Sequence, residues 1–179
     1  KLAGLRSDDD WILDGLFNEP LRLRSFVANN LWAKIYKPYY LKKEPKAKSG
    51  FRAKFVEVFK NNMYYGIYQL SESVDRKQLK LKKDKDSSIN GELYKADSYK
   101  GGPNFTKSPE KYNNTMYWNG WAMRYPSNNY ALGWKNLSEL SNLVVHASDK
   151  EFLNNIESKI EVSNAIDYYL FINLLRATD

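Results

Sequence analysis

The chain has 179 residues, a formal net charge of +7 and a hydrophobic content of 42%, which is enough apolar material for one domain with a sizeable core. It has no cysteine and one histidine, His146, so disulfides and thiolate metal sites are excluded, and neither a histidine metal cluster nor a Ser-His-Asp triad is expected. No apolar run approaches the roughly 20 residues of a membrane-spanning helix, so the sequence predicts no transmembrane segment.

The first elements are an acidic turn and a helix. Residues 6–15, RSDDDWILDG, combine an acidic turn with an apolar patch. A helix is predicted over residues 19–36, because apolar residues recur at helical spacing and Pro20 suits its first turn. A lysine-rich loop follows at residues 37–50, and a second lysine-rich stretch lies at residues 76–85. Both lysine-rich stretches are typical of solvated loops. They could alternatively attract an anionic partner.

The clearest strand signal is a β-hairpin. Residues 54–60 and 64–70 are rich in Val, Phe and Tyr, and Asn61-Asn62 between them tolerates the positive φ of a tight turn. Gly66 within the second strand predicts a bulge or a close backbone approach. Because apolar residues lie on both faces, the hairpin is expected to be covered on both sides.

The second half of the chain begins with a short predicted strand and ends in helices. Residues 91–96, GELYKA, favour the strand, and residues 97–130 are rich in Gly, Pro, Asn and aromatic residues, which predicts an ordered but irregular region. Three helices are predicted after it: 134–147, 150–160 with Asp149 as its cap, and 164–177 with Ser163 as its cap.

The last predicted helix is apolar on nearly all sides, which is typical of a buried helix. Asn173 lies in its main apolar stripe, and a buried amide needs hydrogen-bond partners. Asn173 would therefore tie the helix to a neighbouring loop, or form an ordinary buried hydrogen bond. Asp179 follows the helix directly, where it could present a carboxylate rigidly to a cleft or could be only a polar helix end.

Four stretches together resemble the CotH family, the spore-coat-protein-H-like atypical protein kinases. They are DDDWILDGLFNEPLRLRSFVANNLW, FVEVFKNNMYYGIYQLSESVDR, GELYKAD and AIDYYLFINLLRATD. The second is the specific one, because it matches the pattern V-E-x-x-x-N-G-x-Y-x-G-x-Y-x-L-x-E. Asn62 replaces its second turn residue, usually Gly, and is also competent for a left-handed turn. The residues in register are Val56, Glu57, Gly66, Tyr68, Leu70 and Glu72.

The resemblance implies an α+β, atypical protein-kinase-like fold with two lobes and ATP and Mg²⁺ between them. Residues 1–96, with the hairpin 54–70, would be the small-lobe portion, and residues 97–179 the irregular region and large-lobe helices. Asp179 would be the catalytic-loop carboxylate, acting on the metal or the acceptor hydroxyl. Leu70 and Glu72 would lie at the nucleotide cleft, near the interlobe hinge.

The resemblance also implies a partial domain. The phosphate-binding lysine of the family would precede Lys1, and the second metal-binding group would follow Asp179. The chain alone is therefore expected to be inactive. The full-length protein is expected to phosphorylate Ser or Thr of secreted or spore-surface proteins, as an exported or surface-associated bacterial protein.

Two other functions are open. The first is a non-catalytic surface protein that binds or adheres through the aromatic region at residues 99–130. The second is a nucleic-acid binder, suggested by the sequence pI of about 9.3 and by tyrosines beside the first lysine cluster. No recognised DNA- or RNA-binding motif is present, so nucleic acid is not the favoured partner.

Overall fold

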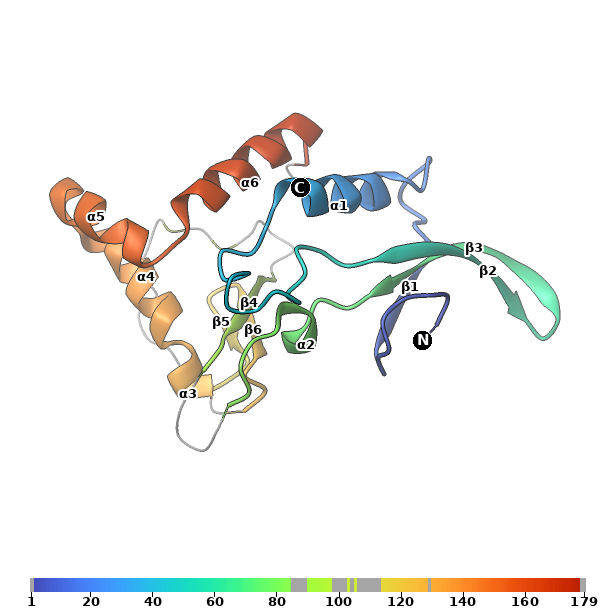
Figure 1. Ribbon diagram of the computed structural model, residues 1–179, viewed down its shortest axis with the longest axis horizontal. Helices are drawn as coiled ribbons and strands as arrows, with labels where there is room; N and C mark the ends of the chain where they lie inside the picture. The colour runs from blue at the N-terminus through green and yellow to red at the C-terminus, as the bar shows by residue number, and fades with distance from the viewer. Residues whose placement is uncertain are drawn as a thin grey trace. The chain divides into compact units, whose positions relative to one another are not determined.

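The computed structural model describes residues 2–84, 90–97, 103, 105, 114–128 and 130–177. The chain forms two compact units, Lys1–Val74 and Asp75–Asp179. Each unit contains one three-stranded antiparallel sheet, which is joined in the described part of the first unit by one helix and in the second by several (Figure 1). The chain is therefore a mixed α and β protein. The division into kinase lobes after residue 96 stays a prediction.

The sheet of the first unit contains the predicted hairpin. Its strands are β1 (Trp11–Asp14), β2 (Ala53–Lys60) and β3 (Met63–Glu72), in the order β1-β3-β2 (Figure 1). The turn residues Asn61 and Asn62 have φ values of 52° and 63°, which asparagine tolerates better than most residues. The antiparallel pairing of β2 with β3 about this turn is confirmed.

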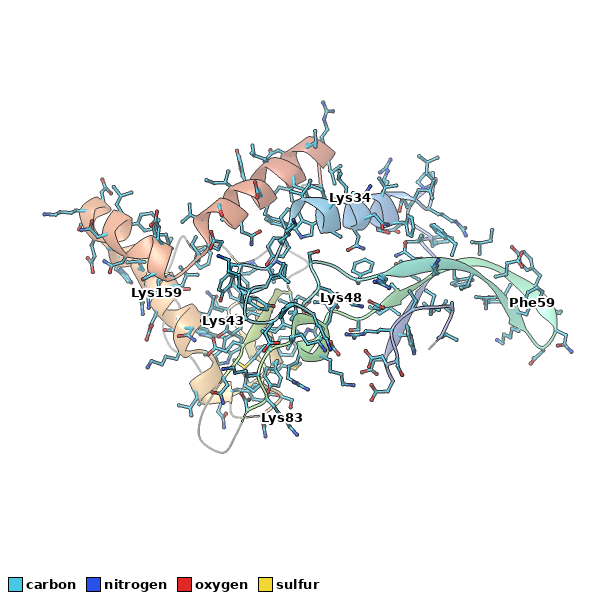
Figure 2. All side chains as sticks on the ribbon, viewed as in Figure 1. Lys34, Lys43, Lys48, Phe59, Lys83 and Lys159 are labelled. Carbon is cyan, nitrogen blue, oxygen red and sulfur yellow. The ribbon has the colours of Figure 1, made fainter. Side chains whose placement is uncertain are left out.

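The predicted irregularity at Gly66 is also confirmed. Val58 pairs with Gly66 and Phe59 pairs with Tyr64, so Tyr65 is the extra residue of a bulge, and Gly66 has a φ of 131°. The expectation that the hairpin is covered on both faces is wrong for its far end, where Phe59 is labelled in Figure 2. There Phe59, Met63 and Tyr64 are 61%, 71% and 56% exposed.

The helix of the first unit, α1 (Arg24–Ile35), begins later than predicted. The carboxylate of Glu19 accepts hydrogen bonds from the backbone N–H groups of Leu23, at 2.9 Å, and of Arg24. A side chain that satisfies these N–H groups caps the helix from outside. Pro20 consequently precedes the helix and does not lie in its first turn.

Helix α1 packs against the sheet near the base of the hairpin. The rings of Phe26 and Phe55 lie 5.1 Å apart, and the hydroxyl of Ser25 donates to Oε1 of Gln69 at 3.4 Å. Because these contacts lie at the N-terminal end of β2 and the C-terminal end of β3, the helix stabilises the base of the hairpin. The far end is left exposed for this reason.

The second unit begins with α2 (Arg76–Leu79) and contains the sheet β4-β6-β5. The short strand β4 (Leu93–Ala96) confirms the predicted one, and it pairs with β6 (Trp121–Tyr125), which also pairs with β5 (Tyr117–Trp118). The prediction of an irregular region over residues 97–130 is therefore wrong for β5 and β6. The buried core beside this sheet is Trp118, Met123, Trp134 and Leu137.

Helices complete the second unit. They are α3 (Tyr130–Gly133), α4 (Lys135–His146), α5 (Asp149–Asn155), the 3-10 turn η1 (Ile156–Ser158) and α6 (Val162–Leu175). The three predicted helices are present, but both predicted caps are wrong. The hydroxyl oxygen of Ser148, and not Asp149, accepts from the N–H of Glu151 at 3.4 Å. Ser163 lies inside α6, where its hydroxyl donates to the carboxylate of Glu161 at 2.7 Å.

The predicted burial of α6 is wrong for the part of the chain that is described. None of its residues is buried, and Tyr169, Leu170 and Leu174 are 64%, 58% and 73% exposed. The amide of Asn173 donates to the backbone oxygen of Tyr169 at 2.7 Å, within its own helix and not to a loop. An all-round apolar pattern leads to burial only where another element covers the helix. Across the described residues, no helix has the length and hydropathy needed to span a membrane.

Candidate functional site

Strand β3 ends in a run of buried residues. Gln69, Leu70, Ser71 and Glu72 are only 4%, 6%, 4% and 1% exposed. Only this end of β3 is hydrogen-bonded on both edges, because β1 pairs with residues 69–72 alone while β2 runs along the other edge. The predicted nucleotide-site residues Leu70 and Glu72 therefore lie in the interior of the first unit.

The carboxylate of Glu72 is held by three donors. Its Oε1 accepts from the backbone N–H of Arg6 at 2.8 Å. Its Oε2 accepts from the backbone N–H of Arg52 at 3.3 Å and lies 3.4 Å from the ammonium nitrogen of Lys48. The backbone N–H of Glu72 in turn donates to the oxygen of Arg52 at 2.9 Å. A buried carboxylate needs such partners, because an isolated buried charge is very costly.

The guanidinium of Arg6 extends this group of charges. Its Nη2 donates to the backbone oxygen of Ser73 at 3.0 Å, and it forms an ion pair with Asp8, whose side chain is 1% exposed. Arg6 thus contacts β3 through its backbone and the residue after β3 through its side chain. We refer to Arg6, Asp8, Lys48, Arg52 and Glu72 as the Glu72 cluster.

The cluster keeps Glu72 ionised. Burial raises the pKa of the carboxyl, but the N–H groups of Arg6 and Arg52 and the charge of Lys48 together outweigh it, so the pKa lies below its ordinary value of 4.5. At neutral pH, Glu72 is therefore a buried carboxylate with a compensating ammonium.

The geometry suits the cluster to positioning and not to reacting. It joins three segments that are distant in the sequence: residues 6–8, residues 48–52 and the end of β3. Both carboxylate oxygens of Glu72 accept hydrogen bonds from protein donors, and removing one partner of a buried pair leaves a costly unpaired charge. Direct nucleotide contact by Leu70 or Glu72 stays a prediction.

Sequence reasoning identified Glu72 but missed its partners Arg6, Asp8, Lys48 and Arg52. Arg6 and Asp8 belong to the acidic turn, and Lys48 and Arg52 belong to the lysine-rich loop and the segment after it. Their charged character was visible, but the separations of 66 and 24 residues from Glu72 follow no local periodicity. The one feature of the sequence that could have indicated these partners is the presence of basic residues, Lys48 and Arg52, just before the predicted hairpin.

The predicted catalytic and metal residue Asp179 lies outside the described residues. Within the described ranges, no group of three or more His, Asp or Glu side chains is placed to hold a metal ion. Mg²⁺ prefers carboxylate and phosphate oxygens, and the carboxylate of Glu72 is already taken by protein donors. The described residues therefore do not themselves fit a magnesium site.

A second polar network lies in the other unit. The hydroxyl of Tyr94 donates to Glu92 at 2.6 Å, and the amide of Asn136 donates to the same carboxylate at 2.9 Å. The Tyr94 ring stacks on Trp134 with centroids 5.6 Å apart. Burial, followed by the hydrogen bond to Glu92, raises the pKa of Tyr94, so its phenol stays neutral. The network therefore joins β4 to α4 and offers no reactive group.

An open groove lies between α4 and the segment from α5 to Lys159. Across it, the ammonium of Lys159 pairs with Glu139 at 2.7 Å. Of the predicted site residues, Leu70 and Glu72 do not line it. Its lining residues are Glu139, Asn142, Leu143, His146, Ala147, Glu151, Asn155 and Lys159.

Comparison with known proteins bears on the whole chain. A family model described as CotH kinase protein matches residues 1–179. No curated protein matches the chain, and neither does any solved structure. The family match agrees with the hairpin pattern that ends at Glu72, and it supports a kinase-like function at the level of the family. Because the match spans every residue, the chain belongs to the CotH family.

Proposed function

We propose that this chain is part of a CotH-type atypical kinase that transfers the γ-phosphate of ATP to Ser or Thr of other proteins. The observation that carries the proposal is the family match over residues 1–179. The hairpin supports it, because Gly66 at its bulge and its terminal Glu72 occupy positions of the family pattern, and Asn62, where the family usually has Gly, keeps the positive φ of the turn. The domain would have two lobes with the nucleotide between them.

The Glu72 cluster would hold the residues next to the nucleotide site in position. It fixes the residues after β3, where Arg6 holds the oxygen of Ser73 at 3.0 Å. The segment from Leu70 to Val74 would run near the interlobe hinge. Catalytic sites need supporting side chains that are locked by their own hydrogen bonds, and the cluster has this property. Glu72 is then a positioning residue.

Asp179 would be the acidic residue that acts on the metal or on the acceptor hydroxyl. Bound Mg²⁺ would neutralise charge on the phosphates of ATP. Because the described residues do not fit a magnesium site, Asp179 and groups outside the described ranges would have to supply its ligands.

The full-length protein would act on secreted or surface proteins and would itself be exported or surface-associated. The alternative is a non-catalytic surface protein with a kinase-like fold, which binds a partner without transferring phosphate. These two functions differ in one measurable quantity, the incorporation of phosphate into an acceptor.

The test uses the full-length protein with labelled ATP, Mg²⁺ and a serine-rich acceptor polypeptide. Asp179→Asn should lower turnover by several powers of ten, because loss of one catalytic carboxylate commonly costs several kcal/mol of barrier and each ~1.4 kcal/mol is tenfold in rate. Asp167→Asn, the same change at an exposed position of α6, is the matched control and should keep full turnover. Melting temperatures should match for all three proteins. Turnover unchanged in Asp179→Asn would reject its role, and no transfer by the unmodified protein would favour the binding alternative.

A further inference from the structure

The end of α1 and the loop after it carry several exposed lysines. Within the first unit, α1 ends at Ile35, and residues 36–52 connect it to β2, which begins at Ala53. Figure 2 labels Lys34 and Lys43 in this part of the chain. We refer to the exposed lysines Lys34, Lys37, Lys42, Lys43 and Lys46 as the lysine patch.

The loop that carries four of the five patch lysines has a fixed backbone. Successive turns are closed by hydrogen bonds from Leu41 N–H to the oxygen of Pro38 at 3.0 Å and from Lys43 N–H to the oxygen of Tyr40 at 2.9 Å. A third runs from Ala47 N–H to the oxygen of Glu44 at 3.0 Å. The loop therefore presents its lysines from an ordered scaffold.

Both ends of the loop are held on α1. The chain leaves the helix at Tyr36, and the hydroxyl of Ser49 donates back to the backbone oxygen of Ala33 at 3.2 Å. A Cβ on Gly50 would lie 2.9 Å from Oδ1 of Asn29, so the returning backbone passes close to the helix at this residue. Such a loop, compact with neighbouring ends, is a common carrier of binding residues.

The charges of the patch are not neutralised within the described part of the chain. No ion pair there involves any of the five lysines, whereas the neighbouring Lys48 pairs with Glu72. Glu44 is the one acidic residue in the loop. A fixed group of like charges creates a positive potential that attracts anionic partners.

The surroundings of the patch favour a polypeptide partner over nucleic acid or membrane. Nucleic-acid surfaces offer several exposed rings for stacking, but Tyr36 already stacks on Trp32 at 5.1 Å, and Tyr39, 74% exposed, packs edge-on against Tyr40. Membrane-binding segments pair lysines with a row of exposed apolar side chains, but the only such side chains exposed within residues 36–50 are Tyr39 and Pro45, and Pro38 and Ala47 are buried. Most of the exposed side chains are therefore separate ammonium groups, which suit anionic side chains on an extended chain.

We propose that the lysine patch is a docking site for an acidic polypeptide segment. The anionic groups could be the carboxylates of Asp and Glu or the phosphates of phosphoserine, since both accept hydrogen bonds from ammonium groups. The site would hold a partner protein independently of any phosphate transfer, so its existence does not depend on the kinase proposal.

The test is a binding titration of the protein followed by fluorescence anisotropy. The probes are a labelled Glu-Ser repeat peptide, the same repeat with phosphoserine, and a Gln-Ser repeat as the uncharged reference. A single-stranded oligonucleotide and anionic phosphatidylserine vesicles are the competing partner classes. The protein should bind one or both acidic peptides, more weakly as salt rises, and should not bind the uncharged repeat.

The decisive variant reverses three patch lysines, Lys42→Glu, Lys43→Glu and Lys46→Glu. Its matched control reverses Lys54, Lys60 and Lys150, which are also exposed, lie outside both lysine-rich stretches and produce the same change of net charge. The patch variant should weaken binding of the acidic peptide by about tenfold or more, and the control by much less. Unchanged circular dichroism spectra should show that both variants fold.

The peptide arms identify the source of the anionic groups. Tighter binding of the phosphoserine repeat would assign the site to phosphorylated segments, and equal binding to acidic segments in general. Equal weakening by the two triple variants would overturn the proposal, because net charge alone would then explain it. Tighter binding of the oligonucleotide or the vesicles, or no binding of either acidic peptide, would overturn it as well.

Discussion

The ammonium nitrogen of Lys48 lies 3.4 Å from Oε2 of Glu72, and the two side chains differ sharply in exposure, 31% for Lys48 and 0% for Glu72. The carboxylate also accepts the N–H groups of Arg6 and Arg52, whereas Lys48 can reach water. The loss of the Glu72 carboxylate would therefore leave several donors without their acceptor. The loss of Lys48 would remove only one of the three donors to that carboxylate. The two partners should contribute unequally to stability.

Glu72→Gln should lower the free energy of unfolding by about 2–4 kcal/mol, because the new amide donors face the donors of Arg52 and Lys48. Lys48→Met should cost less, about 1–2 kcal/mol, since two backbone N–H groups still compensate the carboxylate. Urea unfolding measures both. Lys43→Met is the control, because Lys43 is exposed, and its effect should stay within about 0.5 kcal/mol. A Lys48 effect equal to that of Glu72 would contradict the assignment of the backbone donors.

The cluster should also make stability depend on pH. The pKa of Glu72 is lowered in the folded chain, so the folded state binds this proton less readily than the unfolded state does. The stabilisation is therefore complete above the unfolded pKa, near 4.5, and is lost as the pH falls through the lower folded value. Unfolding curves of the unmodified protein and of Glu72→Gln should converge on acidification from pH ~6 to pH ~3. A stability difference that stays constant over this range would show that ionisation of Glu72 is not involved.

The stability of the hairpin turn should depend on whether the residue at position 62 tolerates a positive φ. Asn62 has a φ of 63°, where glycine is comfortable and β-branched residues are strained. Asn62→Gly should change stability by less than about 1 kcal/mol, and Asn62→Val should destabilise by about 1–3 kcal/mol. Thermal unfolding measures the order of the three proteins. An equally stable Asn62→Val variant would show that the turn is not fixed in this conformation.

In the second unit, replacing Gly133 by alanine sets a gain in helix propensity against a loss of core packing. A Cβ on Gly133 would lie 2.6 Å from Sδ of Met123, which is 1% exposed and has little room to move. Alanine gains about 1 kcal/mol over glycine in a helix, but overpacking costs about 1–3 kcal/mol, so Gly133→Ala should be destabilising.

The control for this prediction is a double-mutant cycle with Met123→Ala, which removes the overlapping sulfur. In that background Gly133→Ala should cost less or become stabilising, with a coupling energy of at least about 0.5 kcal/mol. Additive effects of the two substitutions would mean that the sulfur of Met123 does not limit the space at Gly133.

The sequence by itself determined the features that depend on neighbouring residues. The hairpin was predictable because β-forming residues flank Asn61-Asn62, and Gly66 marked the bulge. The helices α4, α5 and α6 were predictable from apolar spacing, although their caps were not. Ser148 and Ser163 are both residue types that commonly cap a helix. Only the path of the chain decides that the hydroxyl of Ser148 faces a free N–H group and that of Ser163 does not.

The tertiary structure alone decided the surroundings of Glu72 and the exposure of α6. Glu72 obtains its partners from residues 6, 48 and 52, which meet only because β1 and β2 both pair with β3. Apolar character in α6 is a property of its sequence, but burial is a property of what packs on it, and Leu174 remains 73% exposed. Local propensities fix the direction of the backbone over a few residues. Contacts between segments distant in the sequence form only when the sheet brings them together, and these contacts set the charge and burial of the candidate site.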